Sequence, residues 1–97
     1  MPYTVTSLVT KPSNTAFWAK TNATAAQRLA DWTKAQPGVV ASTATLVTAD
    51  TWQTITTFQS QADWSNYQTA AASNADYQAR DQYKTANGQT TVLSFAS

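Results

Sequence analysis

The sequence contains no cysteine, no histidine and no glutamate among its 97 residues. Without cysteine the chain has no disulfide, no thiolate nucleophile and no cysteine ligands for zinc or an iron–sulfur cluster. Without histidine it lacks an imidazole base, a Ser-His-Asp triad and a histidine ligand for haem. These absences remove the side chains on which many hydrolases and metalloenzymes depend.

Charged residues are also scarce, since six Lys and Arg oppose five Asp and the net charge is +1. The Asp residues are scattered, whereas a hard-metal site needs clustered carboxylates. The dispersed basic residues give no electrostatic footprint for nucleic acid. Two glycines are too few for a phosphate-binding loop. We therefore expect no metal, no cofactor and no nucleic-acid partner.

Long apolar runs are missing as well. The uncharged stretch 37–49 is too short and too rich in threonine to cross a membrane. The first residues lack the basic and apolar character of a secretory signal. We expect a soluble protein with no membrane partner, located in the cytoplasm, or in the virion if a phage encodes it.

Threonine and alanine are abundant, with 18 residues of each. β-Branched residues alternate over Tyr3–Val9 and predict a first strand, followed by a loop up to residue 22. Asn22 is a suitable N-cap for a helix over Ala23–Gln36, which Pro37-Gly38 would end. Strands are predicted at Val39–Thr48 and Thr51–Gln59, and the two-residue link between them implies an antiparallel hairpin.

The second half of the chain predicts two helical segments and a last strand. Ser60 and Asp63 have the spacing of a capping box, and Asn74 can cap a further segment, Ala75–Ala86. The last strand is expected at Gln89–Ala96. Helical spacing gathers two stripes of side chains: Trp64, Tyr67, Gln68 and Ala71 on the first segment, and Tyr77, Arg80, Asp81 and Lys84 on the second.

The order β-α-β-β-α-β predicts an α+β, ferredoxin-like fold, with a four-stranded antiparallel sheet and both helices on one face. We expect residues 1–97 to form one such domain, because no internal repeat or linker interrupts the pattern.

The opposite face of this sheet lacks the charges expected of a wet surface. Between Thr43 and Gln59 the only charged residue is Asp50, in the turn, and the last strand has none. Threonine and serine stand where Lys or Arg would normally face water. We therefore expect a homodimer in which two sheets pack face to face. The alternative is that threonine is simply a good strand residue and that this face is solvated.

The element order, the hairpin ending in Asp50-Thr51 and the segment Thr57–Tyr67 resemble the dimeric α+β barrel superfamily, and within it the antibiotic-biosynthesis-monooxygenase-like domains. Arg80–Tyr83, before a loop and the final strand, fits the same resemblance. The resemblance implies fold more than activity, because its members include monooxygenases, haem-degrading enzymes, isomerases and proteins without known activity. The composition also resembles that of small phage and marine environmental proteins.

Within this resemblance, a pocket between sheet and helices could bind a small aromatic ligand. The candidate ligand-binding residues are aromatic or polar and lie on the two helical stripes or in the first loop: Phe17, Trp18, Trp64, Asn66, Tyr67, Tyr77 and Arg80. Structural interpretations are open as well: the Trp and Tyr of the helices are core or rim residues, Phe17 and Trp18 plug the protein's own core, and Arg80 pairs with Asp76 one turn earlier or stays solvated. No catalytic residue can be assigned.

Three functions remain open from the sequence. The first is a non-catalytic accessory protein of unknown function, which predicts a filled interior. The second is a small-molecule-binding or cofactor-independent monooxygenase-like protein, which predicts a cavity of a few hundred cubic ångströms, on the order of known ligand pockets, touching Trp64, Tyr67 or Trp18. The third is a ligand-sensing regulatory domain, although no DNA-binding unit fits in the remaining residues.

Overall fold

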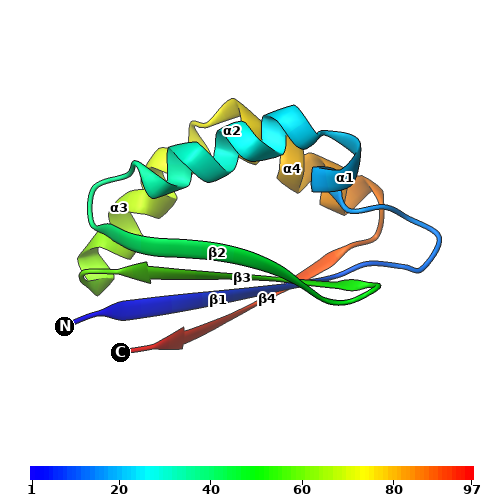
Figure 1. Cartoon of the computed structure of the whole chain (residues 1–97). Helices are drawn as coiled ribbons and strands as arrows, with labels where there is room; N and C mark the ends of the chain where they lie inside the picture. The colour runs from blue at the N-terminus through cyan, green and yellow to red at the C-terminus, as the bar shows by residue number, and fades with distance from the viewer.

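The computed structural model describes all 97 residues as one sheet with every helix on the same face (Figure 1). In chain order the elements are β1 (Tyr3–Thr10), α1 (Trp18–Thr21), α2 (Ala23–Lys34), β2 (Val39–Thr48), β3 (Thr51–Phe58), α3 (Gln61–Ala72), α4 (Ala75–Ala86) and β4 (Thr90–Ala96). No helix has both the length and the apolar content needed to cross a bilayer.

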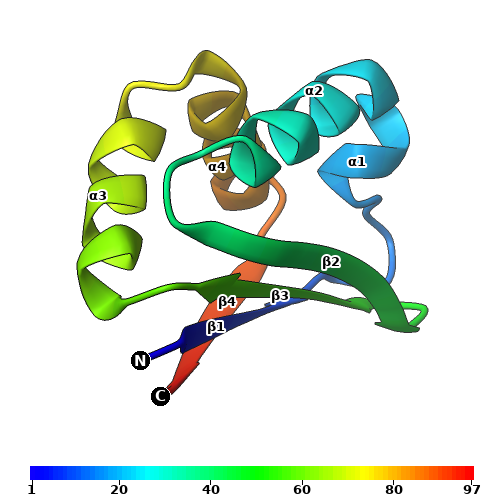
Figure 2. The ribbon, with the colours of Figure 1, turned by 60° about the vertical axis from the view of Figure 1, so that its left-hand side comes forward.

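The strand order β2-β3-β1-β4 is that of the ferredoxin-like fold, and every neighbouring pair is antiparallel. β1 lies in the centre, where Val5 pairs with Thr56 of β3 on one side and with Phe95 of β4 on the other. The predicted α+β architecture is therefore confirmed. In Figure 2, α2 and α3 lie over different parts of the same sheet face, and α4 contacts both of them.

Two helix starts follow the predicted capping residues. Ser60 Oγ accepts a hydrogen bond from the Asp63 amide at 3.3 Å and donates one to the Asp63 carboxylate at 2.9 Å. Asn74 Oδ1 accepts from the Tyr77 amide at 2.9 Å. These caps satisfy amides of the first turns of α3 and α4, and Asn74 begins α4 as a helix separate from α3.

The region before α2 differs from the sequence-based prediction. Residues 18–21 form the short helix α1 instead of a loop, and the Asn22 side chain does not cap α2. The Asn22 amide group instead donates to the Thr21 hydroxyl at 2.9 Å. A helix of one turn is too short to show apolar periodicity, so the sequence does not predict α1.

Gly38 ends the connection from α2 to β2 with a φ of +80°, in the left-handed region that favours glycine. A Cβ atom there would also overlap the Asp63 side chain. Because the Gly38 carbonyl accepts a hydrogen bond from the Gln59 amide, this glycine places the start of β2 beside the end of β3.

The core is small and centred on Phe58, which is the only large side chain that is fully buried. Its ring lies 5.6 Å from that of Trp64 and 5.5 Å from that of Tyr67. On α2, Leu29 and Thr33 are buried. Only nine residues are buried altogether, which implies that much of the space between sheet and helices is open.

The face of the sheet opposite the helices is uncovered in the single chain. Strand alternation puts Ile55 of β3 and Val92 of β4 on it, and they are 38% and 61% exposed. Its other positions are mostly threonine, and none carries a charge: Thr4, Thr6, Leu8, Ala41, Thr43, Thr45, Gln53, Thr57 and Ser94. The edge strands β2 and β4 also contain no charged residue and no proline.

Candidate functional site

A hollow of about 430 Å³ lies between the sheet and the helices α3 and α4. The sheet contributes residues from three of its four strands, β1, β3 and β4, and the helices contribute residues of the two stripes that the sequence predicts. The stripe residues found there are Trp64, Tyr67, Gln68, Tyr77, Arg80, Asp81 and Lys84. The volume is that of a small-molecule site.

Aromatic rings form one wall of this hollow. Trp64 stacks on Tyr67 with ring centroids 6.0 Å apart and an interplanar angle of 22°. The Tyr67 hydroxyl is 3.1 Å from the Thr33 hydroxyl of α2, and burial raises the pKa of Tyr67. Tyr67 is therefore a neutral group with a fixed orientation.

Two cations from α4 line the same hollow. The Arg80 guanidinium lies over the Tyr77 ring, 4.4 Å from its centroid. The Lys84 Nζ donates to Thr91 Oγ1 at 2.8 Å. Both cations share one carboxylate, that of Asp81, at 3.6 Å from Arg80 and 3.5 Å from Lys84. Two cations and one carboxylate give the hollow a net positive charge. Because both ion pairs are long and Asp81 is half exposed, Asp81 offsets that charge only weakly.

Lys84 is held in an environment that disfavours its charge. Burial lowers the pKa of Lys84, and the nearby Arg80 guanidinium lowers it further, whereas Asp81 opposes both effects. An anion in the hollow would reverse this penalty by adding an opposite charge. The local electrostatics therefore favour an anionic or acidic ligand group next to Lys84.

The floor of the hollow is unusually polar for the covered face of a sheet. Ser7, Thr54, Thr56 and Thr91 line it, in positions where apolar residues normally pack against helices. Thr56 donates to or accepts from Ser42 at 2.9 Å. Small hydroxyl side chains leave the space above the sheet unfilled, which explains why the hollow exists.

A second opening, of about 450 Å³, lies between α1 and α2 and the strands β2 and β3. It shares Thr54, Thr56, Tyr67 and Arg80 with the main hollow. The interior is thus reached from two sides, with Tyr67 and Arg80 between them.

Phe17 and Trp18 are 6% and 7% exposed and close one end of the interior. The Phe17 ring is 5.6 Å from that of Trp52, and Lys11 Nζ lies 5.6 Å from the Phe17 centroid. Both residues border a smaller pocket of about 80 Å³ that adjoins the main hollow through Arg80, Lys84 and Gln89. Their burial fits the interpretation that they plug the protein's own core.

The structure thus brings together four of the predicted ligand-binding residues, Trp64, Tyr67, Tyr77 and Arg80. Phe17 and Trp18 lie at the adjoining pocket, and Asn66 is exposed on α3 and does not line the hollow. The expected pair of Arg80 with Asp76 is wrong. Asp76 is instead bound by Arg28 of α2, in two hydrogen bonds of 2.6 and 2.7 Å.

Sequence reasoning also missed several lining residues. Gln89, which was placed in the last strand, precedes it and is buried. Thr54, Thr56 and Thr91 face the hollow because of their register in the sheet. Only the alternation of the strands could have suggested them, and that alternation does not tell which face the helices cover.

No protein-family model matches the sequence. No curated protein matches it either. Solved structures do match the fold. A variant of SnoaB, a cofactor-independent oxygenase from Streptomyces nogalater, is 13% identical with a TM-score of 0.72, and the match covers 99% of this chain and 91% of SnoaB.

Two candidate antibiotic biosynthesis monooxygenases give similar results. The protein from Deinococcus radiodurans is 7% identical with a TM-score of 0.72, covering 98% of this chain and 90% of that one. The protein from Caulobacter crescentus is 11% identical with a TM-score of 0.66, covering 98% and 87%. At such identities the likeness concerns the fold. The chain has the ferredoxin-like α+β fold of the antibiotic-biosynthesis-monooxygenase-like proteins.

Proposed function

We propose that this protein binds a small aromatic molecule with an acidic group in the hollow between the sheet and α3 and α4. The observation that carries the proposal is the 430 Å³ hollow, with an aromatic wall and two cations that share a single carboxylate. A purely accessory protein would be expected to fill this space. The stacked Trp64 and Tyr67 suit a flat ring, and Lys84 suits an anion.

Isothermal titration calorimetry with 2-naphthoate tests this proposal, because the probe combines a flat apolar body with a carboxylate. We expect saturable binding in the micromolar to millimolar range, roughly 4–8 kcal/mol, as is typical of a ligand of this size. Leu93→Trp, which fills the hollow from β4, should abolish binding. Gln82→Trp, on the exposed side of α4, is the matched control and should bind normally. Equal binding by both variants would contradict the proposed site.

A second candidate function is cofactor-independent oxygenation of a phenolic substrate, which the fold likeness to SnoaB favours. In such a reaction a phenolate would react directly with O₂. One oxygen atom would enter the ring as the second quinone carbonyl, the other would leave as water with the two hydrogens lost by the phenol, and all four electrons would come from the substrate. Arg80 and Lys84 would stabilise the phenolate.

Oxygen uptake separates this candidate from simple binding. The chain is mixed with electron-rich phenols such as 1-naphthol in air-saturated buffer without added cofactor. One O₂ consumed per quinone formed would support an oxygenase. If the phenol binds but oxygen uptake does not exceed the protein-free rate, the result would support the binding function and contradict the oxygenase function.

We also propose that the chain forms a homodimer through the uncovered face of its sheet. That face carries no charge and exposes Ile55 and Val92. Four strands of about eight residues present roughly 500 Å² of projected area per copy. Two such faces would bury about 1,000 Å² or more, which reaches the lower limit of specific interfaces.

Sedimentation at micromolar concentration measures this association. The wild-type chain should sediment at twice its 10.5 kDa mass. Ile55→Lys introduces an unpaired charge at the interface and should weaken the dimer at least 100-fold. Gln82→Lys adds the same charge on the helix side and should leave it intact. A 10.5 kDa wild-type species would refute the dimer and leave the ligand site untouched.

A further inference from the structure

Lys84 is the one lysine of the chain that lines both the main hollow and the smaller pocket beside it. Its side chain is 14% exposed, and its hydrogen bond to Thr91 is accessible to solvent. Lys20 and Lys34 are instead exposed on α1 and α2. The amine of Lys84 therefore borders a cavity and can be reached by a small molecule that enters it.

A second cation approaches the same point as Lys84. Lys84 and Arg80 lie one turn apart on α4, and both are near one oxygen atom, Asp81 Oδ1. Lys84 Nζ is 3.5 Å from that atom and Arg80 Nη2 is 3.6 Å from it, so the two nitrogens are at most about 7 Å apart. The Arg80 side chain is 32% exposed, and 3.6 Å is too long for a hydrogen bond. Its guanidinium is therefore free to bind a further carboxylate.

The surroundings of Lys84 favour a nucleophilic amine. Only the neutral amine attacks a carbonyl carbon, because an ammonium group has no lone pair. Burial and the nearby Arg80 charge both lower the pKa of Lys84, as in other lysines that react with carbonyl compounds. The charged and titratable groups that line the hollow with it are Arg80, Asp81, Tyr67 and Tyr77. Asp81 is the one carboxylate among them, and at 3.5 Å it can accept the proton that the ammonium group loses.

We propose that Lys84 forms an imine with a 2-oxo acid whose carboxylate binds Arg80. In a 2-oxo acid the carboxylate is bonded directly to the reactive carbonyl carbon, which suits two nitrogens so close together. The amine adds to the carbonyl carbon and gives a carbinolamine. The carbon–oxygen bond then breaks, and the oxygen leaves as water with two protons of the original ammonium group. The imine keeps the third proton and the positive charge, and with it the ion pair to Asp81.

This reaction goes beyond the binding of an aromatic acid proposed above and does not depend on it. No oxidant or reductant is consumed, because the exchange of a carbonyl oxygen for the Lys84 nitrogen releases only water. The reaction also needs no group besides the side chains of α4 and the oxo acid itself.

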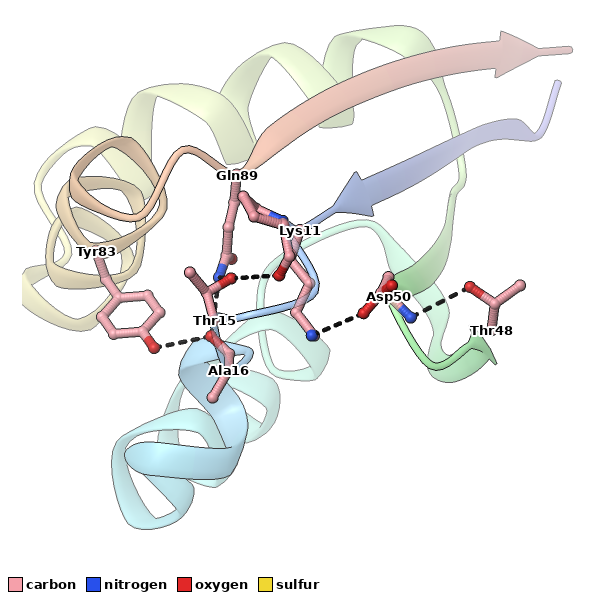
Figure 3. Close-up of polar contacts among 8 residues, drawn as sticks. Lys11, Thr15, Ala16, Thr48, Asp50, Tyr83 and Gln89 are labelled. Atoms are coloured by element: carbon pink, nitrogen blue, oxygen red, sulfur yellow. Dashed lines mark hydrogen bonds and ion pairs between the residues drawn. The ribbon is translucent and has the colours of Figure 1, made fainter.

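Reductive trapping of the full chain with glyoxylate and cyanoborohydride measures this reaction, because cyanoborohydride converts an imine into a stable secondary amine. Peptide mapping by mass spectrometry then gives the labelling rate of every lysine in one sample. We expect Lys84 to be labelled about tenfold faster than Lys20 or Lys34, because the bound carboxylate holds the carbonyl carbon beside the amine. Lys11 is the internal control for burial. It is 10% exposed and donates to the Asp50 carboxylate at 2.8 Å (Figure 3), so it should be labelled most slowly.

Acetaldehyde, a carbonyl compound without a carboxylate, tests the contact with Arg80. The preference for Lys84 over Lys20 should be several-fold smaller with acetaldehyde than with glyoxylate. Arg80→Gln should reduce the preference seen with glyoxylate by a similar factor. Arg28→Gln removes the same charge from α2, outside the hollow, and is the matched control that should keep the preference. In urea the unfolded chain should show no preference with either probe.

Three results would overturn the inference, and all three use the wild-type chain. They are equal labelling of Lys84 and Lys20 by glyoxylate, an equal preference with acetaldehyde, and a preference that persists in the unfolded chain. Added 2-naphthoate separates this inference from the proposed function, because an acid bound in the hollow should slow the labelling of Lys84 and not that of Lys20. Selective labelling without such protection would support the imine and count against the proposed function.

Discussion

Replacement of Phe58 by leucine tests whether one buried ring holds both the core and the wall of the hollow. Phe58 has no exposed surface and contacts the rings of Trp64 and Tyr67 at 5.6 and 5.5 Å. Each aromatic pair contributes about 0.5–1.5 kcal/mol beyond its buried area. Losing both, with a small change in side-chain volume, should cost about 2 kcal/mol. In a domain of this size that lowers Tm by roughly 8–16 °C.

Thermal unfolding followed by circular dichroism measures this loss. Phe95→Leu is the matched control, because the Phe95 ring also contacts two others, those of Tyr3 and Trp64, each at 5.9 Å. Phe95 is 50% exposed, so its replacement should cost about half as much, roughly 1 kcal/mol. A loss for Phe58→Leu no larger than for Phe95→Leu would refute the argument that burial of this one ring sets the stability.

Three further predictions concern charge and capping. Arg28 lowers the pKa of Asp76, so the unfolded chain binds a proton at Asp76 more readily than the folded chain does. The resulting stabilisation is present above about pH 4 and is lost as the pH falls below that value. Between neutral and acid pH, the urea midpoint of Arg28→Ala should therefore decrease less than that of the wild-type chain. The lowered pKa of Lys84 means that its charge destabilises the folded chain at neutral pH and that this penalty disappears as the pH rises above about 10. Lys84→Met should therefore raise Tm without ligand and weaken 2-naphthoate binding about tenfold, whereas a lower Tm with unchanged binding would contradict the role given to Lys84. Asn74→Ala removes the cap of α4 and should cost about 1 kcal/mol in urea unfolding, and a change below about 0.3 kcal/mol would argue against that cap.

The fold could be predicted because local signals along the chain agree with one another. Alternating β-branched residues mark the strands, and the caps Ser60 and Asn74 mark the helix starts where the structure has them. The helix α1 could not be predicted, since four residues are too few for a periodic pattern. The boundary at Gln89 differs by one residue because its amide bonds to the Lys84 carbonyl instead of joining the sheet.

The candidate site was partly predictable for a different reason. Helical periodicity alone places Trp64 beside Tyr67 and Tyr77 beside Arg80. The placement of the Gln89 side chain depends on its hydrogen bond to the Ala16 carbonyl, which is 73 residues away in the sequence, and no local pattern encodes that contact. The partner of Asp76 was mistaken for the same reason, because a residue 48 positions away replaces the one expected a turn along the helix.

The two margins of the sheet have a practical consequence. β2 and β4 leave a row of backbone amides and carbonyls unpaired on each side, and neither strand has the lysine, proline or short length by which many proteins discourage unwanted ladder growth. An extended segment of another chain can form backbone hydrogen bonds with such an edge strand, and this pairing does not depend on its side chains. We therefore expect heated or concentrated solutions of this protein to form fibre-like precipitates, and a lysine placed midway along either margin to reduce them.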